Sequence, residues 1–162
     1  MAVDMFLELE GIKGETHDKV YKAKNAMDIL AWSWGLSNTG TFHMGSGGGA
    51  GKASFNDISI TKYIDKASAD LMLDCANGKH LPKGVITVRK AGEKPLEYLK
   101  ISMTEVLVTA YTTGGSGGED RLTENVSLNF AKVHVEYFMQ NDKGGKEAGG
   151  EMKWDIAGNT KE

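Results

Sequence analysis

The residues of this sequence best suited to hold a metal ion or to move a proton are its histidines. They are His17, His43, His80 and His134. None stands at the spacing from another histidine that zinc sites use, and no His-Glu-x-x-His pattern is present. His134 shares a predicted strand with Val133 and Val135 but points to the opposite face. We therefore expect solvated or interface histidines, and we predict no metal site.

Nucleophilic or acid–base catalysis also lacks a complete set of residues. Ser33 stands between two tryptophans, without the Gly-x-Ser-x-Gly turn that exposes a hydrolase serine. Cys75 is expected late in a helix, far from the N-terminal end that activates cysteine thiols. Glu119 and Asp120 lie in a glycine-rich loop, whereas catalytic carboxyl groups are held rigidly in a cleft. We therefore predict no catalytic residue and no cofactor.

The glycine-rich run at residues 45–53 (GSGGGAGKA) matches a phosphate-binding loop only in part. That loop has the pattern Gly-x-x-x-x-Gly-Lys-Ser/Thr and opens a helix. Counting back from Gly51 and Lys52, Ser46 occupies the first glycine position, and Ala53 stands where the hydroxyl should be. The residues that follow alternate as in a strand, so no helix N-terminus faces an anion. The pattern favours a mobile or contact-making loop over a nucleotide site.

Composition narrows the class of protein. The chain has 162 residues and a formal net charge of −3, so it offers no basic field to nucleic acid. Its single cysteine excludes an internal disulfide and a cysteine-based zinc cage. No apolar run reaches membrane-spanning length, and the N-terminus lacks the features of a secretory signal. We expect a cytoplasmic product, unless export follows a route that needs no signal peptide.

Most of the chain is patterned as β-strands. The longest predicted strands form a pair within residues 95–138, joined by a glycine-rich connection. In the second strand the apolar set switches from even to odd positions across Ala131 and Lys132, which predicts a β-bulge. The other predicted strands lie within residues 3–9, 26–36, 53–63, 82–89 and about 152–156. Residues 11–25 are polar and predict a long surface connection.

One helix is predicted, over about residues 65–77. Asp65 or Ser68 can cap its start, and Gly78 stands where a left-handed residue ends helices. The side chains expected to face the core are Leu71, Met72, Cys75 and Ala76, with Ala67 below them. Together these elements predict an antiparallel β-barrel or sandwich with one helix on its flank.

The segment at residues 29–36 presents two different faces. The bulky one, which we expect in the core, consists of Leu30, Trp32, Trp34 and Leu36. The small one consists of Ile29, Ala31, Ser33 and Gly35, and it can face water or a surface that approaches closely. We expect a single domain over residues 1–162, with flexible loops at about 37–52 and 112–125 and a polar tail after residue 139. On the residues alone, this is a binding or assembly protein.

Several motifs that follow one another along the chain resemble a known family. They are LAWSWG (30–35), TKYIDK (61–66), GKH (78–80), VRKAG (88–92), YL (98–99), EVLV (105–108), TGGSGGEDRLTENV (113–126) and NFA (129–131). Together they resemble the haemolysin-coregulated protein (Hcp) family, the inner-tube proteins of bacterial type VI secretion. The likeness covers residues 2 to about 156. Residues 22–27 and the tail after residue 139 depart from the family pattern.

The resemblance implies a rolled antiparallel β-barrel of two sheets with the helix at about 65–77 on its flank. It also implies a hexameric ring with a central channel. Such rings stack into a tube that a contractile sheath propels from a baseplate, with a spike protein at the tip. Family members hold and protect effector proteins in the ring lumen, and they leave the bacterial cytoplasm for the extracellular space or a target cell. They are not enzymes, and no nucleic acid or membrane insertion is implied.

Two sets of site residues follow from the resemblance. Its motif places Ser33 on the lumen wall, and Ala31 shares the same small face. The loop at about 37–52 resembles an extended loop that reaches across the junction between rings, with Thr39, Phe42, His43, Met44, Gly47 and Gly48 as candidate contacts. Two other readings stay open. One is a monomeric small-ligand-binding β-barrel; the other is a hydrolase with a site near Ser33 or near Glu119 and Asp120.

Overall fold

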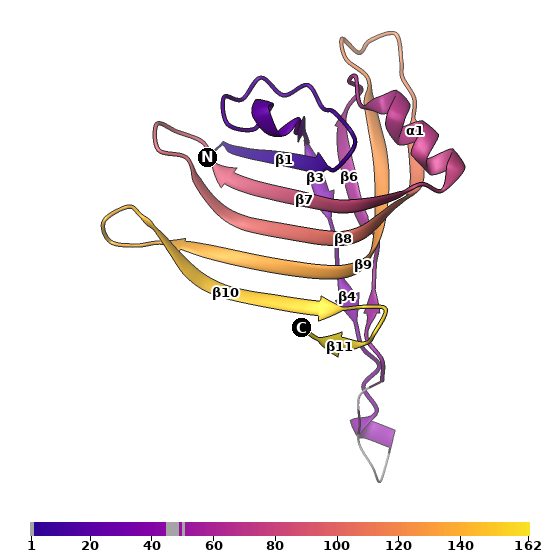
Figure 1. Cartoon of the computed structure of the whole chain (residues 1–162), viewed down its shortest axis with the longest axis vertical. Coiled ribbons are helices and arrows are strands. Elements are labelled where there is room, and N and C mark those ends of the chain that lie inside the picture. Colours follow the sequence, from indigo (N-terminus) through magenta and orange to yellow (C-terminus); the bar gives the residue numbers. More distant parts are fainter. Residues whose placement is uncertain (1, 45–48, 50) are drawn as a thin grey trace.

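Two long antiparallel strands run through the whole fold (Figure 1). The computed structural model describes residues 2–44, 49 and 51–162. In it, β8 (Leu96–Thr113) and β9 (Thr123–Gln140) pair from Leu99 opposite Tyr137 to Thr113 opposite Glu124. This is the strand pair that the alternating pattern within residues 95–138 predicts.

The remaining strands extend this pair on both sides. β1 (Val3–Leu9) pairs with β7 (His80–Lys90), β7 pairs with β8, and β9 pairs with β10 (Lys146–Asp155). The short strands β2 (Met27–Asp28) and β11 (Thr160–Lys161) lie at the two ends of this order. β10 begins at Lys146, well before the strand predicted at about residue 152.

The sheet rolls into a barrel because β9 changes its partner along its length. Residues 132–140 of β9 pair with β10, whereas residues 123–128 pair with β6 (Ile58–Tyr63), which in turn pairs with β3 (Ala31–Ser33). Side chains from both parts meet in one buried cluster that includes Leu7, Ile86, Ile101, Ile58, Ile60 and Leu128. The predicted antiparallel β-barrel with one flanking helix is confirmed.

The irregular positions of the long strand pair lie in β8. The pairing of β8 with β9 keeps one register from Leu99 to Val108 and shifts between Val108 and Ala110. Glu105 has a φ of 56°, in the left-handed region that non-glycine residues seldom adopt. The predicted bulge at Ala131–Lys132 is wrong, because the ladder passes these residues without a shift. Their apolar pattern switches where β9 exchanges β6 for β10 as its partner.

The helix α1 (Ser68–Asn77) lies against the flank of the barrel (Figure 1). Asp65 precedes it and accepts a 2.9 Å hydrogen bond from the N–H of Ala67. Gly78 ends it with a φ of 68°. The buried positions are Ala67, Ser68, Leu71 and Asp74. The predicted apolar side is therefore only partly right, since Met72 and Ala76 are exposed. Within the part of the chain described here, no helix is long and apolar enough to cross a membrane.

The connection between β1 and β2 covers the outer face of the sheet instead of lying free at the surface. Within it, Tyr21 is 1% exposed and stacks on Phe6, with 4.1 Å between ring centroids. The Tyr21 hydroxyl donates a 2.6 Å hydrogen bond to Glu97. The prediction of a surface connection is only partly right: most of residues 11–25 are exposed, but Tyr21 is buried because Phe6, on the outer side of β1, needs an apolar cover. Tyr21 supplies it.

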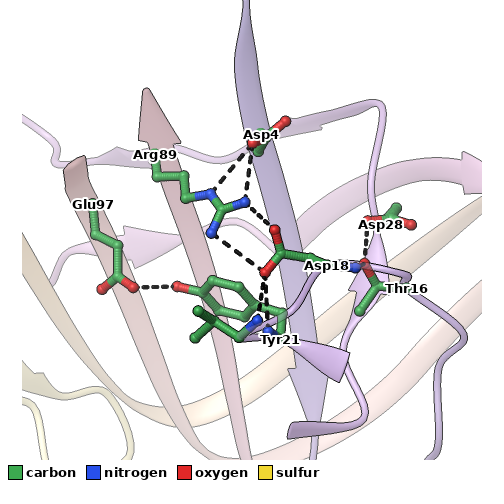
Figure 2. Close-up of polar contacts among 8 residues, drawn as sticks. Asp4, Thr16, Asp18, Tyr21, Asp28, Arg89 and Glu97 are labelled. Atoms are coloured by element: carbon green, nitrogen blue, oxygen red, sulfur yellow. Dashed lines mark hydrogen bonds and ion pairs between the residues drawn. The ribbon is translucent and has the colours of Figure 1, made fainter. Parts of the chain in front are cut away.

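An arginine fastens this connection to the sheet. Figure 2 shows the Arg89 guanidinium between the carboxylates of Asp4 on β1 and Asp18 in the connection. The same guanidinium lies over the rings of Phe6 and Tyr21, at 4.9 and 5.4 Å from their centroids. Burial raises the pKa of Asp18, but hydrogen bonds from Arg89 and two backbone N–H groups outweigh it and hold the pKa below its usual value.

Candidate functional site

The first candidate surface is the outer side of the sheet formed by β3, β6, β9 and β8. Its side chains form two rows across these strands, and each row follows the printed pairing from strand to strand. One row is Ser33, Ser59, Ser127 and Ala110; the other is Ala31, Thr61, Asn125 and Thr112. All of them are exposed or half-exposed. We call this set the small-residue face.

The side chains of the small-residue face are uncharged, and most of them can form hydrogen bonds. Thr61 donates a 2.7 Å hydrogen bond to the side-chain oxygen of Asn125. At its margin, the Asp57 carboxylate accepts hydrogen bonds from Thr109 at 2.7 Å and from Asn129 at 2.9 Å. Such a surface can meet another molecule closely, because it carries no bulky side chain.

A buried ionic cluster lies beneath this face and fixes its strands. Lys62 of β6 and Glu124 of β9 form an ion pair, and both side chains are 0% exposed. Asp65 lies 2.9 Å from the Lys62 ammonium. Ser68 of α1 donates a 2.9 Å hydrogen bond to Glu124, and Tyr111 of β8 donates another. Burial, followed by the hydrogen bond to Glu124, raises the pKa of Tyr111 to about 12. The cluster therefore joins β6, β8, β9 and α1.

Sequence reasoning missed this cluster, although a signal was present. Lys62 continues the inward series of Ile58 and Ile60, and Glu124 begins the inward series of Val126 and Leu128. Two opposite charges at core positions of strands are a reason to expect a buried pair. Strand pairing decides that Lys62 lies opposite Glu124, and this pairing cannot be predicted from the sequence alone.

The tryptophan segment is only partly arranged as predicted. Ala31 and Ser33 are exposed on one face, and Trp32 and Trp34 pack against the core from the other. Leu30 and Leu36, however, are 43% and 52% exposed, whereas Ile29 is buried. The expected alternation fails at both ends because β3 covers only Ala31–Ser33, so the pleat does not extend to the flanking residues.

The second candidate surface is an arm that projects from the barrel (Figure 1). Its base is a small ladder of β4 (Leu36–Ser37) and β5 (Ser54–Phe55). Beyond it, the side-chain amide of Asn38 donates a 2.8 Å hydrogen bond to the carbonyl of Gly51. The short 3-10 helix η2 (Phe42–Met44) lies further out. These contacts give the arm a defined path over its described residues.

The predicted contact residues of the arm are exposed where the structure describes their side chains. Phe42 is 81% exposed, and Thr39 and His43 are exposed as well. Only the backbone of Met44 is described, and Gly47 and Gly48 lie outside the described residues.

The residues weighed for catalysis are not brought together. Ser33 is exposed on β3, Cys75 is half-buried on α1, and Glu119 and Asp120 are exposed in the connection between β8 and β9. Among the hydrogen bonds of the described residues, none joins a histidine or a carboxylate to Ser33. The next residue in that connection, Arg121, lies over the ring of Tyr63, 3.8 Å from its centroid.

Comparison of the sequence with known proteins identifies the family of this chain. Residues 6–137 match the family described as type VI secretion system effector, Hcp. The chain belongs to the Hcp family. It is 54% identical over 163 residues to protein hcp1 of Pseudomonas aeruginosa, and the match covers 99% of each chain. The family predicted from the ordered motifs is therefore confirmed.

Solved Hcp structures share the fold. The crystal structure of Hcp1 from Salmonella typhimurium has a TM-score of 0.80 and 37% identity, with 100% of both chains covered. A type VI secretion system effector from Yersinia pestis has a TM-score of 0.75 and 36% identity, covering 94% of this chain and 99% of that one. Membership of the Hcp family gives this chain a structural role in type VI secretion.

Proposed function

We propose that this Hcp-family chain is the tube subunit of a type VI secretion system. Six copies close into a ring with a central channel, and rings stack into the inner tube. The observation that supports this most is that one barrel carries both a small-residue face and a projecting arm (Figure 1). The first suits the wall of a channel, and the second suits contact with another ring.

Unpaired edge strands of the sheet favour the closure of a ring. Over the described residues, β3 pairs with β6 alone, β2 with β1 alone and β11 with β10 alone. Each of these strands has an edge that a neighbouring copy could cover, which would remove a site of uncontrolled aggregation. A head-to-tail interface between copies closes into a ring when the rotation per subunit divides the full circle.

The small-residue face forms the lumen wall in this proposal, and Ala31 and Ser33 contribute to it from its edge strand β3. Its hydroxyl and amide groups bind effector proteins by hydrogen bonding, and the absence of bulk at these positions leaves room for cargo. The ring protects the bound effector before export. The chain itself performs no catalysis in this role.

The arm makes the contact between rings. Phe42 and its neighbours become buried against the next hexamer, so the phenyl group of Phe42 is no longer exposed to water. We expect this stacking to be weaker than ring closure, so that free rings exist in the cytoplasm before assembly. The stacked tube then meets the spike protein, the contractile sheath and the baseplate, and it leaves the cell without a signal peptide.

The solution mass of the purified protein tests this function directly. Light scattering after size-exclusion chromatography should give the mass of a hexamer, and negative-stain microscopy should show a central hole. A monomer over a wide concentration range would refute the ring and favour a ligand-binding barrel. Against that alternative, the barrel interior is filled by side chains such as Ile58, Ile60 and Leu128, each at most 1% exposed.

A further inference from the structure

Three potential metal ligands meet on the outer side of β9 and β10, outside both candidate surfaces. His134 and Glu136 are alternate residues of β9, so they share a face, and Glu151 of β10 is the cross-strand partner of Glu136. His134 Nε2 lies 2.9 Å from a Glu151 oxygen, and His134 Nδ1 lies 3.6 Å from a Glu136 oxygen. One ligand atom from each residue lies within 4.8 Å of the other two.

The two carboxylates of this cluster need a positive partner. Like charges directly opposite one another on paired strands destabilise a sheet. Lys100 is opposite Glu136 on β8, and Lys153 is opposite His134 on β10. Over the described residues, however, neither lysine forms an ion pair with Glu136 or Glu151. Among the residues that the structure describes, the only side chain within ion-pair distance of both glutamates is the imidazole of His134.

We propose that His134, Glu136 and Glu151 bind a divalent transition-metal ion, Zn²⁺ being the expected one. One imidazole nitrogen and two carboxylate oxygens are a donor set that zinc accepts, with bonds of about 2.0–2.2 Å. Calcium and magnesium fit less well because they require about six or more oxygen ligands. The three protein ligands leave one tetrahedral position open to water.

Side chains must move to admit the ion, although the three ligand atoms already lie within 4.8 Å of one another. Ligand atoms of a tetrahedral zinc site lie roughly 3.3–3.5 Å apart, as follows from the zinc bond lengths. The contact between His134 Nε2 and Glu151 at 2.9 Å must therefore open by a few tenths of an ångström. The exposed Glu151 side chain can make this adjustment, since water surrounds most of it. Glu136, whose oxygen lies 3.6 Å from the other imidazole nitrogen, must turn toward the ion, because one zinc ion binds a single nitrogen of the ring. The ion takes the place of the proton shared by this hydrogen bond and links β9 to β10.

Zinc binding by the full-length, untagged protein tests the proposal. The protein is freed of metal with a chelator, titrated with zinc chloride in a calorimeter, and compared with the variants His134→Gln and Glu151→Gln. We expect one zinc ion per chain and a rise in Tm upon binding. Each variant should weaken binding at least about tenfold, because it removes a ligand atom. Both side chains are at least partly exposed, so the fold should persist, which circular dichroism checks.

Two matched variants serve as controls. His80→Gln alters a histidine that lies 3.9 Å from one carboxylate, Glu105, and over the described residues it forms no ion pair with a second one. Glu147→Gln removes an exposed carboxylate of β10 that is paired with Met139. Both should bind zinc as the unaltered protein does. Zinc binding by Glu151→Gln and His134→Gln that is as tight as in the unaltered protein, or no zinc uptake by the unaltered protein, would overturn the site. Neither result bears on the tube function.

Discussion

Lys62 and Glu124 form an ion pair in which neither side chain is exposed to water. The two residues come from strands β6 and β9, which are paired with each other, and their register places them opposite one another. Ser68 and Tyr111 complete the hydrogen bonding of the carboxylate. The small-residue face lies on the other side of the same strands, so this pair holds the backbone that presents Ser33 and its neighbours.

Removing one partner of this pair should destabilise the protein strongly. Lys62→Met leaves the Glu124 charge buried without its partner, which we expect to cost about 3–5 kcal/mol in the free energy of unfolding. The double variant Lys62→Met with Glu124→Gln should recover part of the loss, because the Glu124 charge is gone and only the Asp65 carboxylate still lacks its Lys62 partner. Urea unfolding followed by circular dichroism measures both. A single variant within about 1 kcal/mol of the unaltered protein would contradict the prediction.

The contact between Arg89 and Asp18 should make stability depend on pH. The folded protein holds the pKa of Asp18 below its usual value, so this group stabilises the fold at pH values above the pKa of the unfolded chain. The contribution is lost as pH falls through the lower, folded value. We therefore expect stability to fall below about pH 4 by a larger amount in the unaltered protein than in Asp18→Asn. Unfolding curves between neutral and acid pH measure the difference.

The same experiment has a control in a carboxylate with no such partner. Asp142→Asn alters an exposed residue in the turn between β9 and β10 and should leave the acid dependence unchanged. If Asp18→Asn and the unaltered protein lose stability in parallel as the pH falls, the Arg89 contact does not supply the effect.

We expect Phe42 to contribute to the stacking of rings but not to the closure of each ring. Phe42→Ala removes the exposed ring from the arm, so we expect hexamers of normal mass but shorter or fewer tubes. Light scattering and electron microscopy at high protein concentration give the two readouts. Val20→Ala, which alters an exposed apolar residue away from the arm, is the control. Loss of the hexamer itself in Phe42→Ala would place the arm in ring closure instead.

We expect Ser33 to affect the binding of effector proteins but not the assembly of the hexamer. Ser33→Leu places bulk on the small-residue face, where it would occupy space that an effector needs. We expect a normal hexamer and several-fold less effector protein purified with it from the native bacterium, as measured by mass spectrometry. Ser116→Leu, in the exposed connection between β8 and β9, is the matched control. Unchanged effector recovery in Ser33→Leu would exclude this face from the lumen.

The sequence by itself determined the strands, the helix and the family. Alternation of apolar residues within residues 95–138 predicts β8 and β9, and Gly78 marks the end of α1. The ordered motifs were sufficient to assign the chain to the Hcp family. These are local signals, because a pleat or a helix end is decided by residues near one another along the chain.

Only the tertiary structure decided which residues meet. The burial of Phe6 depends on Tyr21, the burial of Lys62 depends on Glu124, and the cluster around His134 depends on Glu151. Each pair is joined by the register of strands or by the path of a connection. Register is set by the packing of the whole core, since a slip by one residue would turn every side chain to the other face. No local pattern in the chain contains that information.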